Sequence, residues 1–403
     1  MRDESDLACT MSGVKPTRSR PLFELAGLFL RLGTLAFGGP AAHIAMMEQE
    51  VVQRRGWLSH QEFLDLLGTI NLIPGPNSTE MAIFIGYRRA GWRGLILGGA
   101  CFILPAMLMV MAIAWAYLRF GSLPQAAGLL YGVKPVIIVV ILQALWGLGP
   151  AAIKNRFLAI VGLAATGASL LGVNPLIVLF GAGFLVAATR WVRHGRNSVA
   201  AVLPPLGVGP PMAFLTSASA ASGAAAGVPF GLWTLFVFFL KIGSVVFGSG
   251  YVLLAFLRSD LVERWHWLTA SQFLDAVAVG QVTPGPVFTT ATFIGYVLGG
   301  TLGSVVATVG IFLPSFILVA VGGFFVARVR RSPSAGAFLD GVNVAALALM
   351  AAVTWQLGST ALVDWVTVLL AVVAGVLLLR KVNSAWLVLG AALVGLFAAH
   401  WRT

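Results

Sequence analysis

The chain has 403 residues, of which 59% are hydrophobic and only 10% are charged. Soluble globular domains contain about 45–50% apolar and about 25% charged residues, so this composition excludes a soluble protein and indicates an integral membrane protein. The formal net charge is +12, but most Arg and Lys residues fall in short loops between apolar segments, which is typical of membrane topology signals. We therefore expect the lipid bilayer, and no nucleic acid, among the partners of the chain.

Residues 1–20 are polar and lack the apolar core of a cleavable signal peptide, so we expect a short cytoplasmic N-terminal tail. The rest of the chain contains apolar segments of the kind that form membrane spans, which need about 20 apolar residues each. These segments are 22–47, 63–87, 94–118, 126–149, 157–172, 174–192, 230–257, 272–296, 299–327, 336–358, 361–379 and 383–400. The predicted fold class is an all-α polytopic membrane protein. Cys9 and Cys101 have no metal-ligand spacing, so we expect no metal and no cofactor.

The second half of the chain repeats the first at an offset of 210 residues, which becomes 209 after one insertion beside the first Pro-Gly-Pro. This repeat register aligns Pro-Gly-Pro at 74–76 with Pro-Gly-Pro at 284–286. We predict three units after the tail: a first repeat over 21–196, a linker rich in Gly, Pro, Ala and Ser over 197–229, and a second repeat over 230–403.

The loops of the two halves differ systematically in charge. The loop at 88–93 is basic and the loop at 119–125 carries one Arg, whereas the counterpart of 88–93 is uncharged and that of 119–125 carries Arg328, Arg330 and Arg331. By the positive-inside rule, the two repeats are inserted in opposite orientations. Inverted-topology repeats with broken helices are typical of secondary transporters, whose binding site lies where the repeats meet.

The number of spans depends on how the broken segments cross. If 22–47 and 63–87 both span the membrane, the linker must also cross to invert the second repeat, which gives 13 spans. If one segment of each pair is a re-entrant hairpin, ten spans suffice. We favour ten, because a linker rich in proline and glycine makes a poor span.

Pro-Gly-Pro interrupts the helix in both halves. Open backbone groups at membrane depth are tolerated only where protein or a water-filled cavity surrounds them, and the N-terminus of the following half-helix is suited to an anion. A kink packed against a neighbouring helix is the alternative. The side chains of Asn71 and Gln281 could likewise serve only to form hydrogen bonds with neighbouring helices. The candidate anion-binding residues here are Asn71, Gly75, Asn77, Ser78, Thr79, Gln281, Gly285 and Thr289, and the helix-breaking residues are Pro74, Pro76, Pro284 and Pro286.

A second pair of breaks is rich in glycine. Phe-Gly-Gly-Pro at 37–40 aligns with Phe-Gly-Ser-Gly at 247–250, and such segments let a backbone approach a small ligand. They add Gly38, Gly39, Gly248 and Ser249 to the candidate anion site and Pro40 to the helix breaks. Close helix packing of small residues is the alternative.

Arg31 and Lys241 occupy equivalent positions just before these glycines. A cation inside a span is costly unless it faces a cavity or a partner, so this pair is predicted to bind a dianion. Each cation could instead extend to the interface or pair with a carboxylate such as Glu24.

Few acidic groups fall in the same zone. Glu80 has no counterpart in the second half and is the best candidate for proton coupling, because a carboxyl near the midplane of the membrane can titrate near neutral pH. Asp65, Asp275 and His43 are further candidates. The two aspartates could instead anchor helix starts, and a lone histidine is usually a hydrogen-bonded structural residue.

Three motifs and their second copies carry a family resemblance: Phe-Gly-Gly-Pro at 37–40, Asn-Leu-Ile-Pro-Gly-Pro at 71–76 and Phe-Ile-Gly-Tyr at 84–87. Over nearly all of 21–400 the chain resembles the chromate ion transporter (CHR) family in its long, two-domain form. The resemblance implies a multi-pass transporter of the bacterial inner (plasma) membrane, not an enzyme. It implies chromate export driven by proton motive force or exchange, and chromate resistance.

Sulfate, a tetrahedral dianion of similar size, is the expected competing or exchanged ligand, with protons as a coupling ion and a homodimer as one assembly to test. The residues do not separate chromate from sulfate or molybdate. A membrane enzyme acting on lipid phosphates would need a nucleophile or base clustered with several arginines, and the five histidines are scattered. The second repeat lacks both Pro40 and Glu80, which leaves open whether each half binds an ion.

Overall fold

The computed structural model describes residues 21–121, 123–194, 229–247, 250, 252–329, 333–380 and 382–400, and every regular element in these ranges is a helix. The expected tail and residues 197–228 of the expected linker lie outside the described residues. The helices of the first half are α1 (Pro21–Leu35), α2 (Gly39–Glu48), η1 (Gln49–Arg54), α3 (His60–Ile70), α4 (Asn77–Phe120), α5 (Pro124–Ala152), α6 (Arg156–Leu170) and α7 (Pro175–His194). Those of the second half are α9 (Leu232–Val245), α10 (Leu253–Leu257), η4 (Arg258–Arg264), α11 (Ala270–Val282), η5 (Val287–Thr289), α12 (Thr290–Val329), α13 (Pro333–Ala361), α14 (Trp365–Leu379) and α15 (Ser384–His400).

Within the described residues, five helical stretches are long and apolar enough to cross a membrane: Asn77–Phe120, Gln125–Ala152, Pro175–Val192, Val287–Gly322 and Ser334–Ala361. The composition-based prediction of an all-helical membrane protein is confirmed. The 10 to 13 spans and the inverted orientation of the repeats stay predictions.

Several apolar segments are divided differently from the sequence pattern. The segment 22–47 contains two helices, because α1 ends at Leu35 and α2 begins at Gly39. The expected loop at 88–93, in contrast, is confirmed as a turn: the helical run of α4 is interrupted at Ala90 and Gly91, and its two parts pack side by side, because a Cβ on Gly94 would meet the Gly86 carbonyl and one on Gly98 the Ala82 carbonyl. The turn requires a φ of 59° at Gly91, and α12 repeats it at Gly300 with a φ of 61°, a conformation that glycine adopts without steric cost.

Matched capping boxes start α3 and α11. Ser59 accepts a hydrogen bond from the Glu62 backbone and Glu62 accepts one from the Ser59 backbone, and Thr269 and Gln272 form the same arrangement. Capping satisfies two backbone N–H groups that the first helical turn leaves open. The hydrogen bonds from Ser59 also lower the pKa of the exposed Glu62 carboxyl.

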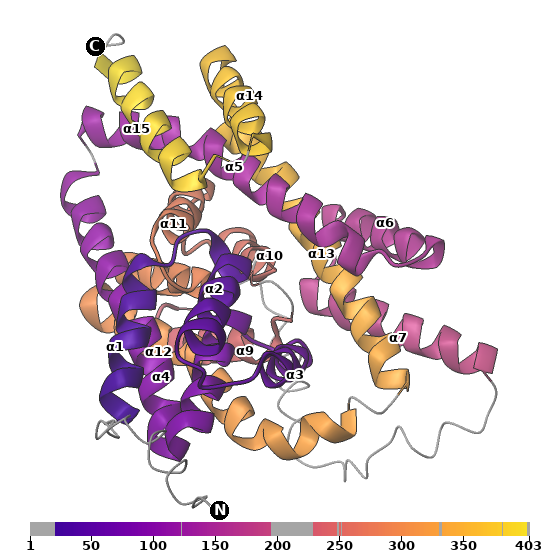
Figure 1. Cartoon of the computed structure of the whole chain (residues 1–403). Coiled ribbons are helices and arrows are strands. Elements are labelled where there is room, and N and C mark those ends of the chain that lie inside the picture. Colours follow the sequence, from indigo (N-terminus) through magenta and orange to yellow (C-terminus); the bar gives the residue numbers. More distant parts are fainter. Residues whose placement is uncertain are drawn as a thin grey trace, which may run out of the picture.

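The later helices of each half pack on the other half (Figure 1). α6 and α7 lie against α13, whereas α14 and α15 lie against α5. Small residues allow these backbones to approach closely: a Cβ on Gly132 of α5 would meet the Ala391 carbonyl of α15, and a Cβ on Gly341 of α13 would meet the Ala182 carbonyl of α7. Since these positions are equivalent in the repeat register, the same contact forms twice.

Candidate functional site: two cavities between the halves

The broken segments of the two halves hydrogen-bond to each other through the backbone. The Gly75 N–H donates to the Val246 carbonyl at 2.8 Å, and the Gly285 N–H donates to the Ala36 carbonyl at 3.0 Å. Each donor is the central glycine of Pro-Gly-Pro, with a φ of 142° or 93°, and each acceptor follows the last residue of α1 or α9. Backbone groups opened by the breaks in one half are therefore satisfied by the other half.

A cavity of about 760 Å³ lies beside these contacts. The C-terminal half of α5 and the middle of α13 form two of its walls, one from each half. Residues next to the breaks complete it: Gly38, Gly39, Pro40, Asn71, Asn77 and Gln281.

Amide side chains supply most of the polarity of this larger cavity, and the described residues that line it include no charged one. The amides are Asn71, Asn77, Gln143, Gln281 and Asn343. Asn77 Nδ2 donates to Asn71 Oδ1 at 2.8 Å, whereas Gln281 Nε2 is buried without a hydrogen-bond partner. α2 and α4 both begin at the cavity, so two helix N-termini add backbone donors. The chemistry of the site is that of neutral donors around a small anion.

The remaining candidates from the breaks lie outside the cavity wall. Pro74, Gly75 and Pro76 separate α3 from α4, and Pro284, Gly285 and Pro286 separate α11 from η5. Ser78, Thr79 and Thr289 are buried, and Thr289 Oγ1 donates to the Pro286 carbonyl at 2.8 Å. Gly248 and Ser249 lie outside the described residues.

The two predicted cations do not line the cavity. Arg31 Nη1 lies 3.7 Å from Glu50 Oε1, and Lys241 Nζ lies 3.8 Å from Asp260 Oδ2. Glu24, the carboxylate that the sequence suggested as a partner, instead pairs with Arg89 at 3.1 Å. The structure thus supports pairing with carboxylates over a dianion cradle made by Arg31 and Lys241.

Sequence reasoning missed the partners of these cations, although the repeat register contains them. Glu50 and Asp260 are equivalent in that register, and both are at least nine-tenths buried. Each lies in a π-helical segment, η1 or η4, that ends in a matched arginine. Burial raises the pKa of the Asp260 carboxyl, and the nearby Lys241 and Arg264 act in the opposite direction.

Glu80 lies within the protein, beside the first Pro-Gly-Pro. Its side chain has no exposed surface, and neither carboxyl oxygen has a hydrogen-bond partner. A Cβ on Gly75 would clash with this carboxyl and with Ser315 Oγ, which is also buried without a partner. Glu80, Ser315 and Gly75 therefore form a small buried cluster beside the first break.

The other predicted proton-coupling residues have different environments. His43 is buried, and its Nε2 donates to the Ala36 carbonyl at 3.0 Å, so the ring supports the first break. Asp65 is exposed on α3, whereas its counterpart Asp275 is 4% exposed.

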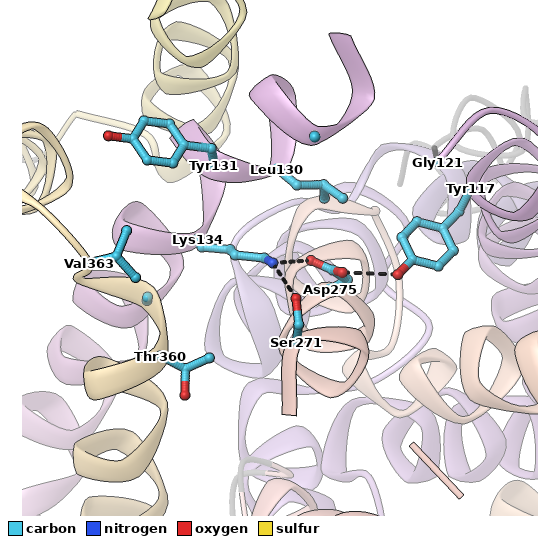
Figure 2. A pocket seen from close by; sticks show the side chains of 11 residues that line it. Tyr117, Gly121, Leu130, Tyr131, Lys134, Ser271, Asp275, Thr360 and Val363 are labelled. Carbon is cyan, nitrogen blue, oxygen red and sulfur yellow. Dashed lines mark hydrogen bonds and ion pairs between the residues drawn. The ribbon is translucent and has the colours of Figure 1, made fainter. Parts of the chain in front are cut away.

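A smaller cavity of about 360 Å³ surrounds Asp275 (Figure 2). Lys134 Nζ of α5 lies 2.8 Å from Asp275 Oδ1 and donates to Ser271 Oγ at 2.9 Å. Tyr117 of α4 donates to Asp275 Oδ2 at 3.0 Å. Three helices from both halves are thus joined by one hydrogen-bonded network.

Sequence reasoning also missed several polar residues of the two cavities, including four within long apolar helices. These are Tyr117, Lys134, Gln143 and Asn343. Each interrupts a strongly apolar helix, which was the available signal, but they lie far from the Pro and Gly motifs. The packing of α4, α5, α11 and α13 brings them to the junction of the halves.

Comparisons with known proteins agree with this architecture. The model of a family described as "Chromate transporter" matches the chain twice, over 23–187 and over 233–396. The "Chromate transport protein" of Cupriavidus metallidurans is 36% identical, over 94% of this chain and 93% of that protein. The "Chromate transport protein" of Pseudomonas aeruginosa is 34% identical, over 86% of this chain and 83% of that protein. No solved structure matches the chain.

Proposed function

Because this chain belongs to the chromate transporter family, we propose that it is a secondary transporter that exports chromate across the bacterial inner membrane. Transport is driven by proton motive force or by exchange, and export confers chromate resistance. The two halves act as inverted repeats around the larger cavity.

The observation that carries this proposal is the larger cavity with its five amides and two helix N-termini. Amide N–H groups and helix N-termini can surround a tetrahedral dianion without a buried cation. A transporter must also release its substrate, and neutral donors bind less tightly than a fixed counter-charge would. The residues we assign to the anion are Gly38, Gly39, Asn71, Asn77, Gln143, Gln281 and Asn343.

Glu80 is the group we assign to proton coupling. It is the buried carboxyl beside the first break, and it has no carboxylate counterpart in the second half. A carboxyl that is neutral in one conformation and ionised in another carries one proton per cycle. Its contact with Gly75 joins the proton to the break that borders the anion.

The proposal is tested by the flux of labelled chromate in proteoliposomes and by chromate accumulation in cells with and without the protein. We expect Gln281→Leu to lower chromate affinity about tenfold, because a hydrogen bond to a charged group contributes about 1.5–3 kcal/mol. Gln356→Leu is the matched control, since this α13 amide lines neither cavity. Absence of chromate flux by the wild-type protein would refute the proposal.

Sulfate is the second candidate substrate, because neutral donors recognise its shape and charge as they do those of chromate. An excess of unlabelled sulfate is therefore included in the flux assay. Sulfate transport with a higher kcat/KM than chromate transport would reassign the substrate and leave the site in place.

A further inference from the structure

The smaller cavity and one end of the larger cavity are built from equivalent positions of the two halves. Lys134, Thr360 and Ala361 line the smaller cavity. Their counterparts in the repeat register line the larger one: Asn343, Ala151 and Ala152. The space between the two halves is thus wide at the end that Asn343 lines. At the equivalent end, which Lys134 lines, a hydrogen-bonded network makes this space narrower.

The two cavities follow one another along the same helices. On α5, the rise from Lys134 in the smaller cavity to Val140 in the larger one is about 9 Å. On α11, the rise from Asp275 to Gln281 is the same. On both helices, residues that line the two cavities are therefore separated by less than two helical turns.

The groups around Asp275 form a built anion site that a carboxylate of the chain already occupies. Lys134 and Tyr117 both approach this carboxylate, at 2.8 and 3.0 Å, and Ser271 accepts a hydrogen bond from Lys134. The side chains of Lys134 and Asp275 are 17% and 5% exposed. Figure 2 shows these side chains meeting between α4, α5 and α11.

The smaller cavity also differs from the larger one in charge. Among the described residues that line the two cavities, Lys134 is the only cation. Its counterpart in the repeat register is the neutral Asn343. A lysine within a helix that crosses the membrane is costly and marks a functional site or a pathway. An ion pair that only joined the halves would not need to line a cavity in continuation of the substrate site.

We propose that Lys134 is a second binding site for the transported oxyanion, and that the Asp275 carboxylate holds this site until a tetrahedral dianion displaces it. The dianion then receives the Lys134 ammonium and the Tyr117 hydroxyl as donors. Binding there moves the anion past the narrower end of the space between the two halves. This inference rests on the proposed function, because it assigns a second station to the same substrate.

The test compares Asp275→Asn, Lys134→Gln and the double variant Lys134→Gln/Asp275→Asn in the full-length protein. Chromate Kd is measured by chromate-dependent thermal stabilisation, and flux is measured in proteoliposomes. The matched control is Lys154→Gln/Asp340→Asn, which neutralises another pair between the halves, with an N–O distance of 2.6 Å.

We expect Asp275→Asn to tighten chromate binding about tenfold, because the lysine loses its competing carboxylate. We expect the double variant not to show the tighter chromate binding of Asp275→Asn, and to transport chromate about 10- to 100-fold more slowly than the wild type. The slower transport is expected even though the two neutral side chains can still hydrogen-bond to each other. The control pair should leave Kd and flux within about twofold of the wild type.

Wild-type flux in the double variant would overturn the inference, since the pair would then be only structural. If the double variant does not fold, an unchanged Kd in Asp275→Asn would overturn it as well. Absence of both binding and flux in the wild-type protein would instead refute the proposed function, so the two failures can be distinguished.

Discussion

The two Pro-Gly-Pro breaks have the same backbone arrangement but different surroundings. In both, the central glycine donates to a carbonyl of the opposite half. A Cβ on Gly75 would meet the Glu80 carboxyl and Ser315 Oγ, whereas a Cβ on Gly285 would lie 2.6 Å from the Ala106 methyl group. Ser315 and Ala106 are themselves equivalent in the repeat register.

The features that the two breaks share determine the backbone structure, and the features that differ determine which break can bind a proton. The shared glycines and carbonyls build the junction, and either half could supply them. The buried carboxyl of Glu80 lies beside the first break only, so a proton can be bound there and not at the counterpart. Substitutions at matched positions of the two halves can test this difference.

The largest effects are expected at the central glycines. Gly75→Ala and Gly285→Ala should each cost about 2–5 kcal/mol of unfolding free energy, from left-handed backbone strain and overpacking. Unfolding of the purified variants in denaturing detergent measures this loss. Ala106→Gly should partly rescue Gly285→Ala, because it removes the overpacking but not the strain, and it should not rescue Gly75→Ala. Equal rescue of both variants would contradict the asymmetry between the breaks.

Glu80→Gln is expected to uncouple transport from the pH gradient while chromate still binds. If one proton moves with each anion, a gradient of one pH unit changes accumulation by up to about tenfold in the wild-type protein, and it should have no effect in the variant. Accumulation in proteoliposomes with imposed gradients provides the measurement. Glu62→Gln is the matched control, because Gln272 already caps the equivalent helix. Unchanged pH dependence in Glu80→Gln would remove Glu80 from the coupling step.

The matched amides of the larger cavity should differ in importance. Asn71 already accepts from Asn77, whereas Gln281 Nε2 is buried without a partner. Gln281→Leu should therefore weaken chromate binding about tenfold and Asn71→Leu only about threefold. Loss of an unsatisfied buried donor should also stabilise the unliganded Gln281→Leu protein by about 1 kcal/mol. Chromate titrations and thermal unfolding check both expectations, and a reversed order of the two affinities would contradict the assignment.

The membrane class, the repeat and the positions of the helix breaks could be predicted because they depend on local composition and on Pro and Gly. Gly38, Pro40, Asn71, Asn77 and Gln281 lie beside these breaks in the sequence, which is why the candidate site includes them. These residues line one cavity because the broken segments of the two halves contact each other.

The sequence could not assign partners to isolated charges. The sequence predicts that Arg31 and Lys241 bind the anion, because a cation in an apolar helix is costly unless it faces a cavity or a partner. The π-helical segments η1 and η4 turn Glu50 and Asp260 toward these cations, and a helical periodicity of 3.6 residues does not predict that geometry. Lys134 was missed for the converse reason, because its partner Asp275 lies in the other half.

The smallest effects are expected at these two cation positions, and they should be unequal. Arg31 is 59% exposed, and Glu50 keeps Arg54 at 2.7 Å and Arg55 at 3.4 Å when Arg31 is removed. Arg31→Gln should therefore change stability by about 0–1 kcal/mol, as is usual for an exposed pair. Lys241 is 26% exposed and lies on the more buried Asp260, so Lys241→Gln should cost about 1–3 kcal/mol, because a buried carboxylate loses its partner. Thermal unfolding separates the two variants, and both should transport chromate within about twofold of the wild-type rate once equal amounts are reconstituted. A selective loss of chromate affinity in both variants would instead return the cations to the substrate site, because loss of a structural ion pair cannot produce it at unchanged stability.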